Sequence, residues 1–132
     1  MAISKGRRKR AVTVIEFSKG SRVDLGKGSF SNLLLTSSTL ADNKSTMGYS
    51  VFKPGVNTTL KVHHGAEELA YVISGSGNIT IEAGTVGFKE GDSIFIPSGV
   101  AHGIENNGEK DVVMIFFFST PKYPRTTDAV GC

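Results

Sequence analysis

The sequence contains little cysteine and no long hydrophobic segment. Its single cysteine among 132 residues is Cys132, so no intramolecular disulfide can form between these residues. A zinc finger or zinc ribbon is excluded as well, because each needs several cysteines. The longest apolar run, residues 112–118, has the length of a strand, whereas a membrane-spanning helix needs about 20 apolar residues. We therefore expect a soluble, cytoplasmic protein with no signal peptide and no membrane partner.

Runs of helix-forming residues are also scarce. The one such run, residues 66–71, continues directly into Val72 and Ile73, which favour strands. Strand-type segments, separated by turns rich in glycine, occupy residues 12–17, 33–36, 48–52, 58–63, 69–74, 78–83, 92–97 and 112–118. Short strands without intervening helices are typical of an antiparallel sandwich or barrel. The pattern therefore predicts one all-β domain.

Positive charge is concentrated at the start of the chain. The formal net charge is +3, from 15 Lys and Arg against 12 Asp and Glu. Residues 1–10 contain no acidic residue and five basic ones, which are Lys5, Arg7, Arg8, Lys9 and Arg10. Residues 11–132 therefore carry a net charge of −2. We expect a disordered basic tail at 1–10, a single domain at 11–132, and no nucleic-acid partner.

Two segments place the three histidines of the chain at regular distances from glycine, proline and acidic residues. The first segment contains Gly55, Lys61, His63, His64, Glu68 and Gly75. The second contains Gly91, Pro97, Gly99, His102 and Asn106. Together they resemble the paired motifs of the cupin superfamily, G-x5-H-x-H-x3-4-E-x6-G and G-x5-P-x-G-x2-H-x3-N. The resemblance extends over residues 48–118 and implies an antiparallel double-stranded β-helix, or jelly-roll barrel.

The two motifs match to different degrees. The second is complete, but in the first Lys61 stands where the motif has a histidine. Alternate side chains of a strand share a face, so Lys61 and His63 would point into the barrel while His64 points away. In a second registration His64 takes the later histidine position, which places Val62 at the earlier one. Neither registration restores both histidines of the motif.

The resemblance implies a metal site. Its ligands would be His63, Glu68 and His102, with His64 as a substitute or fourth ligand. Two histidines and one carboxylate leave coordination positions open for a substrate. This ligand set suits a divalent transition metal and favours Fe(II), with Mn(II), Ni(II), Co(II) or Zn(II) as alternatives.

Lys61 and Tyr71 are the candidate catalytic residues. A dication beside Lys61 would favour the neutral amine, which could act as a general base, and the charged form could bind a substrate carboxylate. An equally weighted alternative is that Lys61 simply replaces a lost metal ligand. Tyr71 belongs to a group of aromatic residues that are candidate pocket walls, together with Tyr49, Phe95, Phe116 and Phe118.

The function expected from the resemblance is that of a small metal-dependent enzyme. Its substrate would be a small polar or carboxylated molecule, and its chemistry that of a dioxygenase or of a lyase or isomerase. The alternative is a non-catalytic cupin that binds a small metabolite or sugar. Because cupin sheets commonly pair through an edge strand, the resemblance also implies a homodimer.

Overall fold

The computed structural model describes residues 7–9 and 12–129, and most of their regular structure is β-strand. The strands are β1 (Arg7–Lys9), β2 (Val12–Val14), β3 (Ser21–Gly26), β4 (Ser29–Leu35), β5 (Thr46–Phe52), β6 (Lys61–His64), β7 (Glu68–Ser74), β8 (Ser76–Ile81), β9 (Gly84–Lys89), β10 (Ser93–Ile96), β11 (Gly103–Glu105), β12 (Val112–Phe118) and β13 (Arg125–Asp128). In the part of the chain that the structure describes, the only helical element is one 3-10 turn, η1 (Phe17–Lys19). No helix in this part is long and apolar enough to cross a membrane. The all-β prediction is confirmed.

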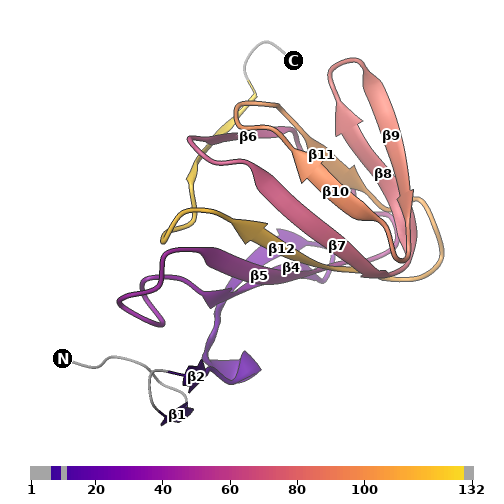
Figure 1. Ribbon diagram of the computed structural model, residues 1–132. Helices are drawn as coiled ribbons and strands as arrows, with labels where there is room; N and C mark the ends of the chain where they lie inside the picture. The colour runs from indigo at the N-terminus through magenta and orange to yellow at the C-terminus, as the bar shows by residue number, and fades with distance from the viewer. Residues whose placement is uncertain (1–6, 10–11, 130–132) are drawn as a thin grey trace.

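Apart from the separate pair β1-β2, the strands form two layers that face each other, as Figure 1 shows. One layer is a six-stranded sheet in the order β10-β7-β12-β5-β4-β3. The other contains the three-stranded sheet β11-β8-β9 and the pair β13-β6, which the bridge between Lys61 and His102 links to the segment before β11. All strand pairs are antiparallel. This arrangement is the predicted jelly roll.

The core lies between the layers, and β12 supplies much of it. This strand pairs with β5 on one side and with β7 on the other. Because side chains alternate between the two faces of a strand, Val112, Met114, Phe116 and Phe118 are buried in the core, whereas Phe117 is 37% exposed. The apolar run at 112–118 is therefore a central strand whose alternate members fill the interior.

The register of the large sheet sorts the inward-facing residues into cross-strand rows. The first row contains Thr46, Phe118 and Glu68, the second contains Gly48, Phe116 and Ala70, and the third contains Ser50, Met114 and Val72. Successive rows are two residues apart, which is about 7 Å along a strand. Glu68 thus brings a carboxylate into the first row, the second row is apolar, and Ser50 brings a hydroxyl into the third.

Gly48 in the second row makes space for the ring of Phe116. A Cβ atom at Gly48 would lie 2.1 Å from Cζ of Phe116, which is far inside van der Waals contact. Only a residue without a side chain therefore lets the ring occupy this place on the sheet.

A second glycine, Gly75, carries the chain from one layer to the other. It lies between β7 and β8 with φ of 86°, and a Cβ atom there would be 2.3 Å from the carbonyl oxygen of Asp111. Both the positive φ and the close approach of the backbone require glycine. The turn therefore ends β7 just where the chain must leave the large sheet.

The structure differs from the predicted strands at several places. Residues 84–89, which lie between two predicted strands, form β9, and the strand predicted at 12–17 ends at Val14. Strands β3, β11 and β13 were not predicted. Of the tail predicted as disordered, Arg7–Lys9 form a strand paired with β2, and the rest of the tail lies outside the described residues, as does Cys132.

Candidate metal centre

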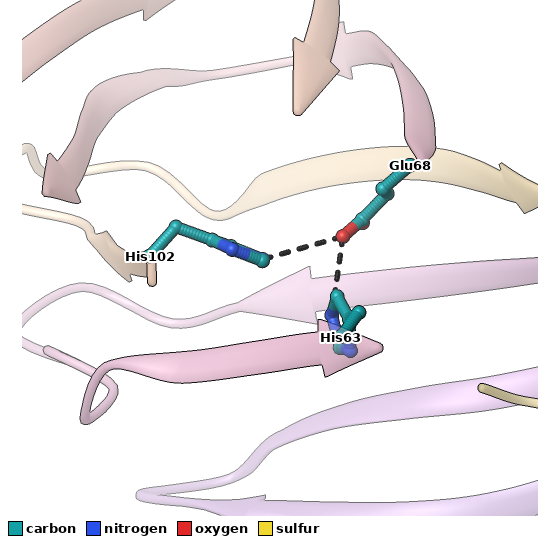
Figure 2. A group of neighbouring side chains, drawn as sticks. All are labelled: His63, Glu68 and His102. Atoms are coloured by element: carbon teal, nitrogen blue, oxygen red, sulfur yellow. Dashed lines mark ion pairs between the residues drawn. The ribbon is translucent and has the colours of Figure 1, made fainter. Parts of the chain in front are cut away.

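Three side chains from different parts of the fold converge between the layers. His63 comes from β6, Glu68 begins β7, and His102 precedes β11. Figure 2 shows them pointing toward one another, with Oε1 of Glu68 lying 3.3 Å from Nε2 of His63 and 3.3 Å from Nε2 of His102. One donor atom of each residue lies within 4.8 Å of the other two. Both imidazoles are buried, so the cluster is largely shielded from water.

Thr126 of β13 determines which nitrogen of His63 faces the cluster. Its hydroxyl donates a hydrogen bond to the carbonyl oxygen of Pro124 at 2.9 Å and lies 2.8 Å from Nδ1 of His63. Because the only hydroxyl proton is already used, Thr126 Oγ1 must accept the second bond, so Nδ1 of His63 carries a proton. In a neutral ring the lone pair is then on Nε2, directed at Glu68.

His102 is oriented in the same way by the backbone. Its Nδ1 lies 3.0 Å from the carbonyl oxygen of Val100, which can only accept, so Nδ1 donates. The lone pair of the neutral ring again lies on Nε2. Both rings therefore have the tautomer and the supporting hydrogen bond typical of metal-bound histidine.

Three electron-rich atoms that converge in this way need a cation between them. Oε1 of Glu68 is buried and makes no regular hydrogen bond to any described residue, and an unsatisfied buried carboxylate oxygen is costly. A divalent metal ion would satisfy all three donors at once. The residues present therefore fit a metal with a 2-His-1-carboxylate ligand set.

The pKa shifts of Glu68 and His102 also indicate that the cluster favours a positive charge beside the carboxylate. Burial by itself would raise the pKa of Glu68, but His102 and His63 lower it below its ordinary value. Burial would lower the pKa of His102, but Glu68 and the carbonyl of Val100 raise it above its ordinary value. The cluster thus holds its carboxylate ionised and attracts a cation, which is either a proton or a metal ion.

A cavity of about 250 Å³ opens beside the three donors. Its wall is mainly apolar, and its lining residues are Val23, Leu25, Ser31, Ser50, Phe52, Thr58, Lys61, His63, Glu68, Ala70, Ile79, Ile94, Ile96, His102, Gly103, Ile104, Met114, Phe116, Tyr123 and Thr126. The volume is that of a small organic ligand. A molecule in the cavity would meet the donors at one end and apolar side chains along its body.

Lys61 lines the cavity but is not one of the converging donors. It shares the inward-facing side of β6 with His63, as expected, and its side chain is 47% exposed. Its Nζ pairs with Oδ1 of Asp128 on the neighbouring strand β13. The position where the motif has a histidine is therefore held by a lysine that lines the cavity and whose ammonium group pairs with Asp128.

His64 and Tyr71 lie away from the cluster. Nε2 of His64 is 2.7 Å from the hydroxyl of Thr127, so this ring is directed at β13 and does not join the three donors. Tyr71 is 47% exposed and belongs to the outward-facing set of β7, opposite in direction to Glu68 and Ala70. The alternation of strand side chains explains both placements.

Tyr123 and Thr126 line the cavity although the sequence pattern did not indicate them. The ring of Tyr123 packs edge-on against His63, with 5.6 Å between centroids. Burial and the charge of Glu68 raise the pKa of Tyr123 to about 12. The hydroxyl is therefore neutral near neutral pH. The only signal at this position is an aromatic residue between Pro121 and Pro124.

The other aromatic candidates divide between the two sides of the sheet. Phe116 lines the cavity, and Phe118 packs against His63 with 5.0 Å between ring centroids. Tyr49 instead contacts Phe17 of η1, and Phe95 is 58% exposed. Of these four candidates, the two on β12, Phe116 and Phe118, therefore contribute to the site, whereas Tyr49 and Phe95 do not.

The family model of the cupin domain matches residues 48–118, the span that holds both motifs and all three donors. The chain belongs to the cupin family. The resemblance noted from the two motifs is thereby confirmed.

Curated relatives of this cupin include two proteins of polyketide synthesis. Polyketide synthase CurC of Streptomyces cyaneus is 26% identical over 112 residues, which cover 85% of this chain and 70% of CurC. Tetracenomycin polyketide synthase protein TcmJ of Streptomyces glaucescens is 27% identical over 99 residues, which cover 75% of this chain and 66% of TcmJ. An uncharacterized protein, MJ1618 of Methanocaldococcus jannaschii, is 34% identical over 65 residues. The match spans 49% of this chain and only 52% of the archaeal protein.

Solved structures similar to this cupin include oxalate decarboxylases. The crystal structure of a predicted oxalate decarboxylase from Thermotoga maritima has a TM-score of 0.65 and 26% identity, covering 81% of this chain and 98% of that one. The Bacillus subtilis oxalate decarboxylase, a protein with Mn(II) centers, has a TM-score of 0.74 and 20% identity. The match covers 85% of this chain and 30% of the Bacillus protein. The second likeness is one of fold alone.

Proposed function

We propose that this cupin is a metal-dependent enzyme that acts on a small molecule bound in the cavity between its two layers. The observation that carries the proposal is the convergence of two imidazole Nε2 atoms and one carboxylate oxygen at the wall of that cavity. The three donors leave coordination positions free toward the cavity, which a purely structural metal site would not need. Fe(II) is the ion that this ligand set favours.

The residues around the donors have separate roles in this proposal. His63, Glu68 and His102 hold the ion, and the chemistry that a bound ion supplies is polarisation of substrate oxygens or activation of dioxygen. The neutral hydroxyl of Tyr123 donates a hydrogen bond to a substrate oxygen near Glu68. Lys61 binds a carboxylate or another anionic group of the substrate at the cavity wall.

The cavity refines the expected substrate. A small polar or carboxylated molecule suits the donors and Lys61, but most of the lining is aliphatic or aromatic. The substrate is therefore one with an oxygen-rich end and an apolar body. Its conversion is of dioxygenase or of lyase or isomerase type, and turnover with and without dioxygen separates the two classes, because only a dioxygenase needs the gas.

Metal analysis of the purified protein tests the proposal directly. The protein, prepared without chelator and reconstituted with Fe(II), Mn(II) or Zn(II), should bind about one ion per chain. His102→Ala should abolish binding, whereas His64→Ala, the matched histidine outside the cluster, should leave it unchanged. Metal content below about a tenth of an equivalent, or equal losses in both variants, would contradict the proposal.

The role of Lys61 has its own test. If this residue only replaces a ligand, Lys61→His should strengthen metal binding and leave turnover intact. If the ammonium group binds substrate, as we propose, Lys61→His should lower turnover or raise KM without a loss of metal. A variant with stronger metal binding and unchanged kinetics would exclude the substrate role.

We also propose that two copies of the chain pair through the outer face of the large sheet. Phe95, Leu69 and Phe117 lie side by side across β10, β7 and β12, and each is at least 37% exposed. Tyr71 and Ile73 continue this apolar surface along β7, with exposures of 47% and 44%. A contiguous exposed apolar surface of this kind is typical of an interface.

A further inference from the structure

Two serines interrupt the apolar wall of the cavity. Ser31 of β4 and Ser50 of β5 are directly opposite each other in the antiparallel register, and their hydroxyl oxygens are 2.7 Å apart. Both line the cavity, and Ser50 is only 2% exposed. On either side of the pair lie Val23 of β3 and Met114 of β12, which also line the cavity. The two hydroxyls are therefore hydrogen-bonding groups flanked on both sides by apolar side chains of the cavity wall.

The pair lies far from the metal ligands along the same sheet. The row of Ser50 is two rows from the row of Glu68, with Phe116 and Ala70 between them. Four residues along a strand correspond to about 13 Å, and two strands across correspond to about 10 Å. The cavity thus has a polar group at each end and apolar side chains in the middle.

The hydroxyl pair retains unused hydrogen-bonding capacity. Two serine hydroxyls have two donor hydrogens and four acceptor positions, and the bond between them uses one of each. Among the residues that the structure describes, neither hydroxyl makes a further hydrogen bond. One donor and several acceptor positions are therefore free at the cavity wall. A ligand that brings an oxygen to this point gains a hydrogen bond, whereas a purely apolar ligand leaves the group unsatisfied.

We propose that the Ser31–Ser50 pair is a second polar subsite of the cavity, which binds a hydroxyl or carbonyl oxygen at the far end of a ring-containing, largely apolar substrate. The phenyl ring of Phe116 in the apolar middle row offers a surface against which a ring of the ligand can pack. The serine pair then selects ring systems that carry an oxygen remote from the three donors. That this molecule is the substrate rests on the proposed function. The preference of the serine pair for a ligand oxygen does not rest on that function, because the two hydroxyls bind a ligand without a metal.

Two fluorescent probes test the subsite in the full, metal-free protein. They are 2-naphthol and 2-methylnaphthalene, which differ by a hydroxyl in place of a methyl group. Because the chain has three tyrosines and no tryptophan, naphthalene emission can be followed at wavelengths longer than the protein emission. We expect the protein to bind 2-naphthol about fivefold more tightly, the size of one neutral hydrogen bond. The Ser31→Ala/Ser50→Ala double variant should lose this preference, while Ser31→Thr, which keeps a hydroxyl, should retain it.

Two controls separate the subsite from general effects. Ser93→Ala removes a hydroxyl outside the cavity and should leave the preference unchanged. In the wild-type protein, 2-naphthol should shift the backbone amide resonances of Ser31 and Ser50, which does not depend on any variant folding. Equal affinity for both probes, binding of neither probe, or a preference that survives in the double alanine variant would overturn the subsite.

Failure of the proposed function gives a different result. His102→Ala should remove the metal and leave the preference for 2-naphthol as it is. The double serine variant should keep its metal content and lose the preference. If the protein never binds metal but shows the serine-dependent preference, the proposed subsite stands and the proposed enzymatic function fails.

Discussion

Thr126 contacts the candidate metal centre through a single hydroxyl group. Because that hydroxyl donates to Pro124 and accepts from His63, it holds the imidazole in one tautomer and one orientation. Loss of a hydrogen bond of this kind typically lowers the metal affinity of a site by about 10- to 100-fold. Thr127, the next residue, makes the corresponding contact with His64 outside the cluster.

Thr126→Val should weaken metal binding by about tenfold or more, because Nδ1 of His63 loses its acceptor and the ring is free to turn. Thr127→Val is the matched control and should bind metal as the wild type does. Competition with a chromophoric chelator measures both affinities. Equal affinities in the two variants would show that the hydroxyl of Thr126 does not position the ligand.

Gly48 provides a second prediction for a single residue. Gly48→Ala should destabilise the fold by about 1–3 kcal/mol, because the new methyl group would displace the ring of Phe116. In Gly87→Ala the nearest atom would be 3.5 Å away, so this control should change stability far less. Urea denaturation measures both. If Phe116→Leu is added to Gly48→Ala, part of the lost stability should return.

Among the elements, the loop between β11 and β12 depends on one buried amide. Nδ2 of Asn106 donates to the carbonyl oxygens of Phe52 and Lys110, and its Oδ1 accepts from the amide of Gly108. The side chain is 1% exposed. The asparagine of the second motif thus ties the end of β5 to the loop, and its role is structural.

Asn106→Ala should lower the free energy of unfolding by about 2–3 kcal/mol, because it leaves buried backbone groups without partners. Asn107→Ala, at the exposed neighbouring position, should change it little. Chemical denaturation of the two variants tests the comparison. Similar losses in both would mean that the buried amide does not stabilise the loop.

The strands differ in how far their sequence predicts them. Residues 112–118 are continuously apolar and form β12 over that whole range. Strand β9 contains two glycines, Gly84 and Gly87, which are typical of turns, and its register against β8 makes it a strand. Strand β13 has the polar sequence RTTD, and only pairing with β6, about 60 residues earlier in the chain, gives it strand structure.

The same distinction applies to the site. The resemblance to the two cupin motifs implied that His63, Glu68 and His102 would meet. The alternation of strand side chains favoured His63 as the inward-facing residue, but the second registration left His64 open as a ligand. Thr126 and Tyr123 lie far along the sequence and belong to no motif. Their positions depend on where β13 docks, which no local pattern indicates.

For the whole molecule, the exposed apolar face of β10, β7 and β12 predicts the oligomeric state. The protein should be a dimer in light scattering at micromolar concentration. Phe95→Asp should shift it to a monomer, because a charge would be buried in the interface. Val86→Asp, at an exposed apolar position on β9 in the other layer, should remain dimeric. A monomeric wild type, or a dimer in both variants, would contradict the proposed interface.

The contacts of β13 have a consequence for the lifetime of the protein. This strand pairs with β6 alone, and its Thr126 is hydrogen-bonded to a ligand of the metal centre. Coupling between two binding events is reciprocal, so an ion that holds His63 in place would also hold β13 against the domain. An ion bound by the three donors would therefore also protect β13 from proteolysis, and chelation of that ion should make this strand easier to cleave.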